Sequence, residues 1–448
     1  MSIYITRVKA IGVHGRFDFD QELRSGMNIL HGLNGSGKTT FLQIVANALN
    51  SDFQRFQYIK FKYIKIIYSD DRFLEISWNR KKNVIEISRS DRRVKHELNR
   101  DENNHKVFNG LEPLVSAFYV PAFRLLVDAW FSSKDYQHLN IQEIVDKKTS
   151  YSRKVFGEFT PEIEYPSVTE VIDSLDTDLK NARLKLANFE REIFLNSLVE
   201  FYTTISKNAV TTDLKSVNYN DVSEVITKLD SHKLQDKNIS FSEFIERTRD
   251  LIPKFNGTKS VLDIHYKCFT ALLKYQEECY KDLDSYLDAV NLFLVNNELV
   301  FEKENENSSN PSFCFKYKTQ EFSETLPVQG LSSGERQIVS LIYAFYIARE
   351  KIILIDEPEI SLHIDWQRDF PKSVSNYSRQ MIICTHSPML TSDCRDSLTK
   401  LKVKLTTEEI LWDDESEELD ENTQEMDDYD ATEYQEEYQE DIASAIQL

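Results

Sequence analysis

Short apolar segments at the start of the chain predict β-structure followed by a helix. Apolar and polar side chains alternate over residues 3–8, and residues 27–30 form a short apolar run that leads into a glycine-rich loop. From residue 38 to 50 the apolar side chains recur at helical spacing instead. This order predicts a strand, a loop and a helix.

Three further alternating runs predict an antiparallel meander. They cover residues 63–69, 72–78 and 83–88, and charged turns separate them. Another strand is expected at 115–120, where Pro121 follows.

A heptad pattern marks the middle of the chain. Seven apolar side chains recur at alternating steps of three and four residues: Ile172, Leu175, Leu179, Ala182, Leu186, Phe189 and Ile193. Such a stripe predicts a packed helical hairpin or a short coiled coil. Helices are also expected at 242–251, 260–280 and 283–295, and strands at 298–302 and 313–317.

Charge is distributed unevenly over the 448 residues. The net charge is −20, but residues 408–448 contain 18 acidic residues and neither Lys nor Arg. The rest of the chain has 56 acidic and 54 basic residues and is nearly neutral. The acidic end has no periodicity, so disorder is expected from about residue 406. This tail is a candidate dock for a basic partner.

The remaining composition indicates a cytoplasmic protein. The longest apolar stretch, 338–348, is too short to span a bilayer, and no signal segment opens the chain, so no membrane partner is expected. None of the five cysteines lies in a Cys-x-x-Cys pair, which fits a reducing compartment.

The glycine-rich loop has the G-x-x-x-x-G-K-[ST] spacing of a phosphate-binding loop. Backbone N–H groups and the following helix N-terminus suit phosphate oxygens. Lys38 is expected to reach the terminal phosphates, and the Thr39 hydroxyl is expected to ligate Mg²⁺. The expected nucleotide-binding residues are Asn34, Gly35, Ser36, Gly37, Lys38, Thr39 and Thr40.

Two later apolar segments end in candidate catalytic residues. The segment 351–355 leads into Asp356, a candidate Mg²⁺ ligand, and Glu357, a candidate base for the attacking water. The segment 381–384 leads to His386, which could contact the terminal phosphate. A lone histidine is more often structural, so the phosphate role depends on the other motifs.

Four ordered motifs together resemble those of ABC-class ATPases. They correspond to the Walker A, signature, Walker B and H-loop segments of that class: Gly32–Thr39, Leu331–Glu335, Ile355–Pro358 and Thr385–Pro388. The sequences LSSGERQ, DEPEISLH and THSP are similar to the SMC/RecF-like and OLD-type group rather than to transporter ATPases.

This resemblance implies ATP and Mg²⁺ as cofactors, and ATP hydrolysis as the activity. It also implies a dimer that shares ATP between subunits. The signature residues acting on the partner's ATP would be Ser332, Ser333, Gly334 and Glu335. The chain departs from the pattern after residue 120, where Arg124 stands near the place of the usual Q-loop glutamine.

The predicted fold class is α/β: an ABC-type ATPase head with a mixed sheet and an antiparallel β subdomain. The expected divisions are 1–150 and 297–405 for the two parts of the head, 151–296 for an inserted helical or coiled-coil domain, and 406–448 for the disordered acidic tail.

The leading functional hypothesis is an ATP-driven switch. It would assemble with itself and control a separate effector, such as a nuclease or toxin, in prokaryotic anti-phage defence. One alternative is a RecF/SMC-like DNA-binding ATPase in repair or chromosome maintenance. Another is an ATP-dependent clamp with little turnover.

A basic cluster offers a candidate nucleic-acid contact. Its members are Arg80, Lys81, Lys82, Arg92 and Arg93. Acidic residues are interleaved with these bases, so an ordinary charged hairpin is an equally good interpretation.

Overall fold

Two large β-sheets and a set of helices form the described part of the chain. The computed structural model describes residues 3–92, 96–99, 112–131, 139–207, 219–234, 259–302, 312–318, 325–360, 362–374, 380–391 and 394–405. The expected helix at 242–251, the tail from residue 406 and Arg93 lie outside these ranges.

A five-stranded sheet carries the predicted catalytic motifs. Its order is β14 (Leu398–Lys400), β3 (Gly26–His31), β13 (Gln380–Thr385), β12 (Ile352–Asp356) and β8 (Ala117–Val120), and neighbouring strands are parallel. Every residue of β12 and β13 is buried, which explains their continuous apolar sequences. The carboxyl ends of β3, β12 and β13 therefore meet at one edge.

A seven-stranded antiparallel sheet contains the predicted meander. Its order is β15 (Val403–Leu405), β2 (Phe17–Glu22), β1 (Ile5–Val13), β4 (Tyr63–Tyr68), β5 (Phe73–Asn79), β6 (Val84–Arg89) and β7 (His96–Asn99). Alternate side chains of β4 and β6 are buried, as expected for a sheet covered on one face. The meander of β4, β5 and β6 is confirmed.

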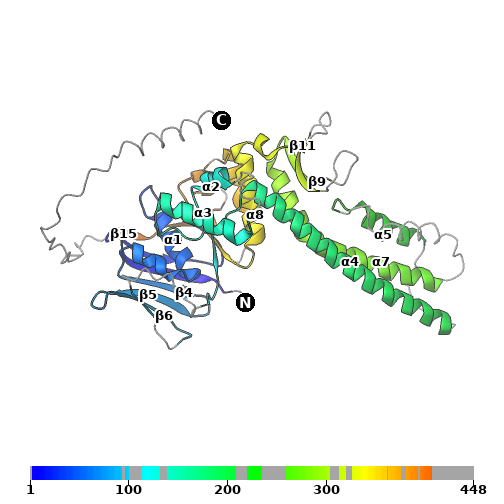
Figure 1. Cartoon of the computed structure of the whole chain (residues 1–448), viewed down its shortest axis with the longest axis horizontal. Helices are drawn as coiled ribbons and strands as arrows, with labels where there is room; N and C mark the ends of the chain where they lie inside the picture. Colours follow the sequence, from blue (N-terminus) through cyan, green and yellow to red (C-terminus); the bar gives the residue numbers. More distant parts are fainter. Residues whose placement is uncertain are drawn as a thin grey trace. The chain divides into compact units, whose positions relative to one another are not determined.

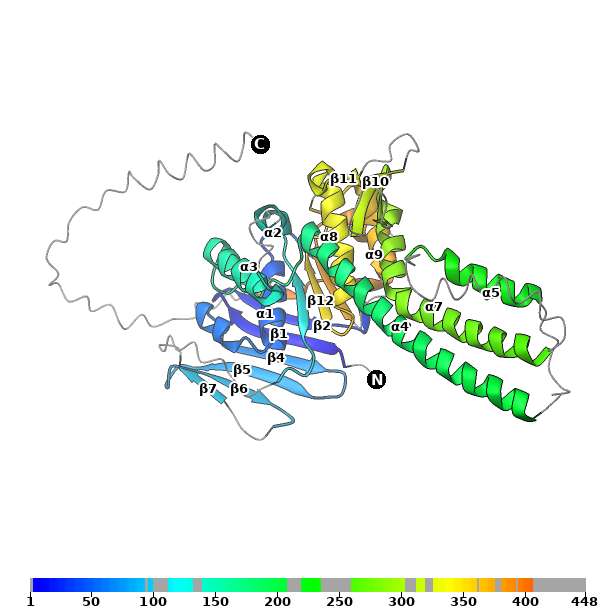
Figure 2. The ribbon, with the colours of Figure 1, turned by 45° about the vertical axis from the view of Figure 1, so that its right-hand side comes forward.

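Helix α1 (Lys38–Leu49) packs between the two sheets (Figure 2). It contacts β12 and β13, while its Phe41 ring lies 5.6 Å from the Phe19 ring of β2. A 3₁₀ helix, η1 (Phe53–Tyr58), follows it.

Several shorter helices pack around the parallel sheet. They are α2 (Arg124–Phe131), α3 (Ile141–Phe156), α8 (Ser333–Ile347), α9 (Ile364–Val374) and α10 (Pro388–Thr391). The sequence pattern did not predict α2 or α3. Two 3₁₀ turns, η4 (Val328–Gly330) and η5 (Arg395–Ser397), complete this region.

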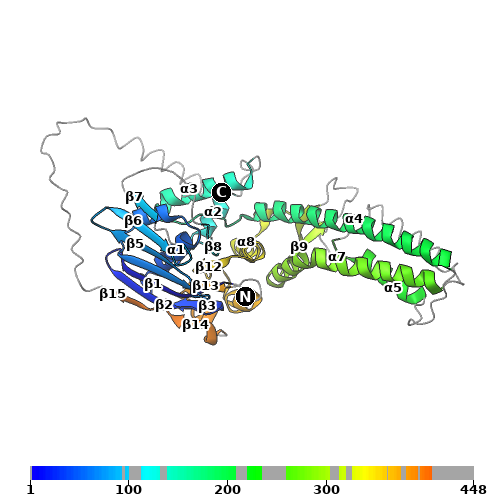
Figure 3. The same cartoon turned by 90° about the horizontal axis from the view of Figure 1, so that it is seen from below.

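The heptad stripe lies on a long helix, α4 (Val168–Lys207), which runs beside α7 (Lys259–Phe293) in Figures 1 and 3. Phe189 of the stripe stacks on Tyr275 of α7 with ring centroids 4.0 Å apart. The prediction of separate helices at 260–280 and 283–295 is wrong, because α7 is continuous across the expected break.

Two smaller elements complete the helical region and its junction with the head. Helix α5 (Tyr219–Ser231) packs on α7. A three-stranded sheet of β9 (Asn297–Glu302), β10 (Ser312–Tyr317) and β11 (Thr325–Leu326) follows α7. The Tyr286 hydroxyl donates to the Val339 carbonyl at 3.1 Å, which joins α7 to α8.

The α/β fold class is confirmed, while the four domain boundaries stay a prediction. Within the described ranges, no helix combines the length and apolar character needed to cross a membrane.

Candidate nucleotide site

The phosphate loop joins β3 to α1 through two glycines with positive φ. Gly35 has φ +76° and Gly37 has φ +83°, a region that side chains with a Cβ rarely adopt. A Cβ on Gly37 would also lie 2.8 Å from the Phe19 ring. Asn34 and Gly35 are exposed at the loop tip, and Thr40 lies in the first turn of α1. These features fit a loop that presents backbone N–H groups to phosphates.

Lys38 is folded over this loop. Its ammonium group donates to the carbonyls of Gly32 at 3.0 Å and Leu33 at 3.2 Å, and the side chain is 5% exposed. The same group lies 4.0 Å from a carboxylate oxygen of Glu357. The Lys38 ammonium therefore lies between the loop and the end of β12.

The fold brings together Thr39 and Asp356, the two predicted Mg²⁺ ligands. The Thr39 hydroxyl donates to Asp356 Oδ2 at 2.7 Å. Asp356 is fully buried, and burial is the main reason that its pKa is raised to about 6. Its other oxygen, Oδ1, is buried without a hydrogen-bond partner among the described residues.

A hydroxyl beside a buried carboxylate with an orphaned oxygen fits a Mg²⁺ ion, which prefers oxygen ligands. Thr39 and Asp356 would hold the ion, and a bound ion would supply positive charge next to the nucleotide phosphates.

Glu357 and His386 meet at the same sheet edge. The parallel pairing of β12 with β13 aligns Asp356 with Cys384, so the residues that follow each strand are neighbours. His386 Nδ1 lies 3.4 Å from Glu357 Oε1, and the two side chains are 46% and 23% exposed, respectively. A solvent-reachable carboxylate beside a histidine and a lysine has the chemistry needed to orient water near a phosphate.

Glu359 has a role that the sequence analysis did not assign. Its Oε1 accepts hydrogen bonds from the Thr385 hydroxyl at 2.7 Å, from the His386 N–H at 3.0 Å and from the Ser387 N–H at 3.1 Å. The carboxylate is 7% exposed and fixes the backbone on both sides of His386. Its sequence position, two residues after Glu357 in the turn that follows β12, was the available signal.

The signature segment forms the N-terminus of α8. Ser332 is the N-cap, and its hydroxyl accepts from the Glu335 N–H at 3.3 Å. The Glu335 carboxylate accepts from the Ser332 N–H at 2.9 Å and from the Asn297 side chain at 2.8 Å. Ser332 and Ser333 are exposed, whereas Gly334 is partly buried. The capping box thus fixes a helix end whose N–H groups could receive an anion.

Among the described members of the basic cluster, Arg80, Lys81 and Lys82 lie in the β5–β6 turn and Arg92 follows β6. Lys82 pairs with Glu97 at 3.0 Å, and the Arg80 guanidinium lies 5.7 Å from the centre of the Trp78 ring. Lys81 and Arg92 are exposed.

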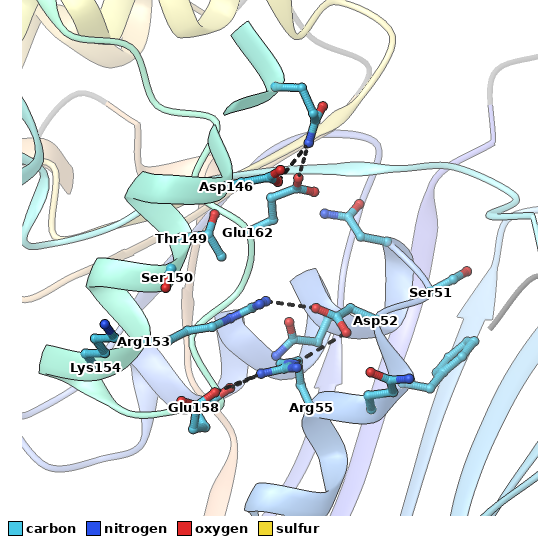
Figure 4. A pocket seen from close by; sticks show the side chains of 15 residues that line it. Ser51, Asp52, Arg55, Asp146, Thr149, Ser150, Arg153, Lys154, Glu158 and Glu162 are labelled. Carbon is cyan, nitrogen blue, oxygen red and sulfur yellow. Dashed lines mark hydrogen bonds and ion pairs between the residues drawn. The ribbon is translucent and has the colours of Figure 1, made fainter. Parts of the chain in front are cut away.

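A separate polar cavity of about 890 Å³ lies at the opposite end of α1 from the phosphate loop. Figure 4 shows Arg55 directed toward Glu158 and Arg153 toward Asp52, at 3.0 Å and 2.9 Å. None of the predicted nucleotide or catalytic residues lines this cavity. These ion pairs join α3 and the segment after it to η1.

The fold and the loop define a P-loop nucleotide-binding protein. Residues 16–391 match the family described as AAA ATPase domain, which spans most of the chain, and the protein belongs to this family. It is an ATPase, as the sequence predicted. No curated protein matches the chain.

The solved structures that match the chain share little sequence with it. The Smc head domain of Pyrococcus furiosus, with an extended coiled coil and bound to the C-terminal domain of ScpA, is 12% identical. That match covers 90% of this chain and 96% of the other, with a TM-score of 0.38. The recombination mediator RecF with ATP is also 12% identical, covers 90% and 98%, and has a TM-score of 0.34.

Proposed function

We propose that this ATPase is a Mg²⁺-dependent switch that closes into a dimer when two subunits share ATP. Lys38 and Thr39 bind the nucleotide and the ion, Asp356 completes the ion site, and Glu357 activates water. Ser333 and Gly334 contact the ATP that is held by the other subunit. The cycle ends when hydrolysis removes the phosphate that joins the subunits.

The clustering of the predicted catalytic residues carries this proposal, and the exposed signature helix adds the second subunit. The Thr39–Asp356 pair, Glu357 and His386 gather at one sheet edge. The exposed Ser333 begins another helix, whose capping residues bond to one another and to Asn297. The N-terminus of α8 is exposed and its position is fixed by the capping box. Its backbone N–H groups are therefore suited to bind a phosphate that a second subunit supplies.

The Glu357→Gln variant tests the proposal. We expect turnover to fall by about a hundredfold or more, because the general base is lost. ATP binding should be retained, and an ATP-dependent dimer should accumulate in size-exclusion chromatography with light scattering. Glu22→Gln, an exposed change on β2, is the matched control. Unchanged turnover would instead favour the clamp with little hydrolysis.

The larger role that we propose is control of a separate effector in anti-phage defence, within the cytoplasm. The motif resemblance to OLD-type ATPases supports this role, and the strongly acidic residues 408–448 could dock a basic partner. Co-purification from the native host tests it: a nuclease or toxin retained with the full chain and lost on deleting 408–448 is expected. Retention after the deletion would remove the tail from the proposal.

The basic hairpin favours a second candidate, a DNA-binding ATPase. Lys81 and the Arg80–Trp78 pair could contact a phosphate backbone. Duplex DNA binding that weakens steeply with salt and is lost in an Arg80→Ala, Lys81→Ala double variant would support it. Binding that survives these changes would count against this surface.

A further inference from the structure

Helix α2 carries two buried charges on one face. Arg124 and Asp128 stand four residues apart, one helical turn, and are 0% and 5% exposed. The helix follows β8, which pairs with β12 in the parallel sheet. A charge buried this completely needs a partner. The partners of Arg124 and those of Asp128 lie on different elements of the fold.

Arg124 contacts the backbone of the turn after β12. Its guanidinium donates to the carbonyls of Glu357 at 3.2 Å, Pro358 at 2.8 Å and Ile360 at 3.0 Å. Burial lowers the pKa of this guanidinium, and the neighbouring acidic groups oppose that shift. A planar fork of donors can span several carbonyls, which a lysine ammonium cannot do in the same way.

This contact bears on the conformation of Glu357. Glu357 has φ +45°, a left-handed conformation that costs free energy for a residue with a Cβ. Its N–H donates to the Cys384 carbonyl at 2.8 Å, and its own carbonyl accepts from Arg124. The strained residue is thus fixed on both sides, by β13 and by α2.

Asp128 connects the same helix to two other elements. Its Oδ1 accepts from the Val168 N–H, the first residue of α4, at 3.3 Å. Its Oδ2 lies 3.7 Å from the guanidinium of Arg336, in the first turns of the signature helix α8. A single short helix therefore contacts the catalytic turn, the start of the long helix and the signature helix.

We propose that Arg124 is the positioning residue for Glu357 and that α2 couples the catalytic turn to α4 and α8. Arg124 fixes the left-handed backbone that directs the Glu357 carboxylate toward the nucleotide, and Asp128 transmits a shift of this turn to α4. This inference rests on the proposed role of Glu357 in activating water.

Arg124→Lys tests the positioning role in the full chain. It keeps the charge but removes the planar fork, so we expect kcat to fall by about tenfold or more while the KM for ATP changes less than about twofold. Arg183→Lys is the matched control, because Arg183 also donates to a carbonyl, that of Leu234, on the helical insertion. An unchanged kcat for Arg124→Lys, alongside an inactive Glu357→Gln, would overturn this inference and leave the proposed function intact. Unchanged turnover in both variants would overturn the function.

Hydrogen exchange of the wild-type protein tests the coupling without any substitution. Amides of α2 and of the first turns of α4 should gain protection together when Mg²⁺ and ATP are added. Protection of α4 without α2 would overturn the coupling role, and a response in neither helix would do the same.

Discussion

The Thr39 hydroxyl donates to the Asp356 carboxylate at 2.7 Å, although the two residues are 317 positions apart in the sequence. This bond joins the start of α1 to the end of β12, and Asp356 Oδ1 stays buried without a hydrogen-bond partner among the described residues. The pair is the structural basis for expecting a divalent ion beside the nucleotide.

Removing this carboxylate should weaken the use of Mg²⁺. In Asp356→Asn, we expect the Mg²⁺ concentration for half-maximal turnover to rise by about tenfold or more, because one anionic ligand is lost. A Mg²⁺ titration of ATP hydrolysis measures this, with the exposed Asp365→Asn as control. An unchanged Mg²⁺ dependence would contradict the assigned ion site.

Lys38→Ala should remove most ATP affinity. The lost charge-assisted bonds to phosphate correspond to a weakening of roughly ten- to a hundredfold. Equilibrium titration with a fluorescent ATP analogue measures the change, and Lys62→Ala, an exposed substitution, should bind normally. Retained affinity would show that the loop does not bind the phosphates through Lys38.

Ser333→Arg should separate ATP binding from assembly. The bulky cation at the start of α8 would block the approach of a second subunit's phosphate, while the chain's own loop is unaltered. Light scattering with ATP should then report monomers, and Ser231→Arg at the exposed end of α5 should still assemble. Continued ATP-dependent association of the Ser333 variant would refute the shared site.

Glu359→Ala should lower both stability and turnover. Three donors, from Thr385, His386 and Ser387, would lose their common acceptor, at a cost of about 3 kcal/mol in the free energy of unfolding. Denaturant unfolding measures this, and turnover should fall because His386 is released. Glu359→Gln retains an acceptor oxygen and should be milder. Equal stability of the alanine variant and the wild type would argue against this network.

Glu190→Gln should stabilise the protein at neutral and higher pH. Burial raises the pKa of Glu190 from 4.5 to about 7. The folded chain then binds more protons than the unfolded chain between these values, so this carboxyl lowers stability as pH rises through that range.

Replacing the carboxyl should therefore raise the free energy of unfolding by about 1–2 kcal/mol at pH 8, after allowance for partial solvation, and have little effect at pH 4. Thermal unfolding at both pH values checks this, with the exposed Glu192→Gln as control. Equal shifts at the two pH values would contradict the assignment.

The motifs were predictable because local sequence determines them. A glycine loop before Lys38, and apolar strands before Asp356 and His386, each carry their signal within a few residues. The parallel pairing then brings their ends together. Glu359 and Arg124 were harder, because their partners come from distant segments that only the folded sheet makes adjacent.

The sequence pattern did not predict helix α3, for a different reason. Its buried face includes Lys148, Thr149 and Ser152 rather than a clear apolar stripe. Lys148 is buried because it pairs with Glu170 and donates to the Tyr165 carbonyl at 2.9 Å. Periodicity of apolar residues cannot reveal a face that is stabilised by polar pairs. In α7 a different error arose, because one helix crosses the expected break at 281–282 and buries Tyr280, Leu283 and Leu287 on both sides of it.

The close approach of Gly37 to Phe19 limits which residues position 37 can hold. The phosphate loop belongs to the parallel sheet, but the ring that limits its space belongs to a strand of the antiparallel sheet. Only a residue without a Cβ fits between the loop and this ring. A larger residue at position 37 would therefore disturb the packing of the antiparallel sheet as well as the binding of the nucleotide.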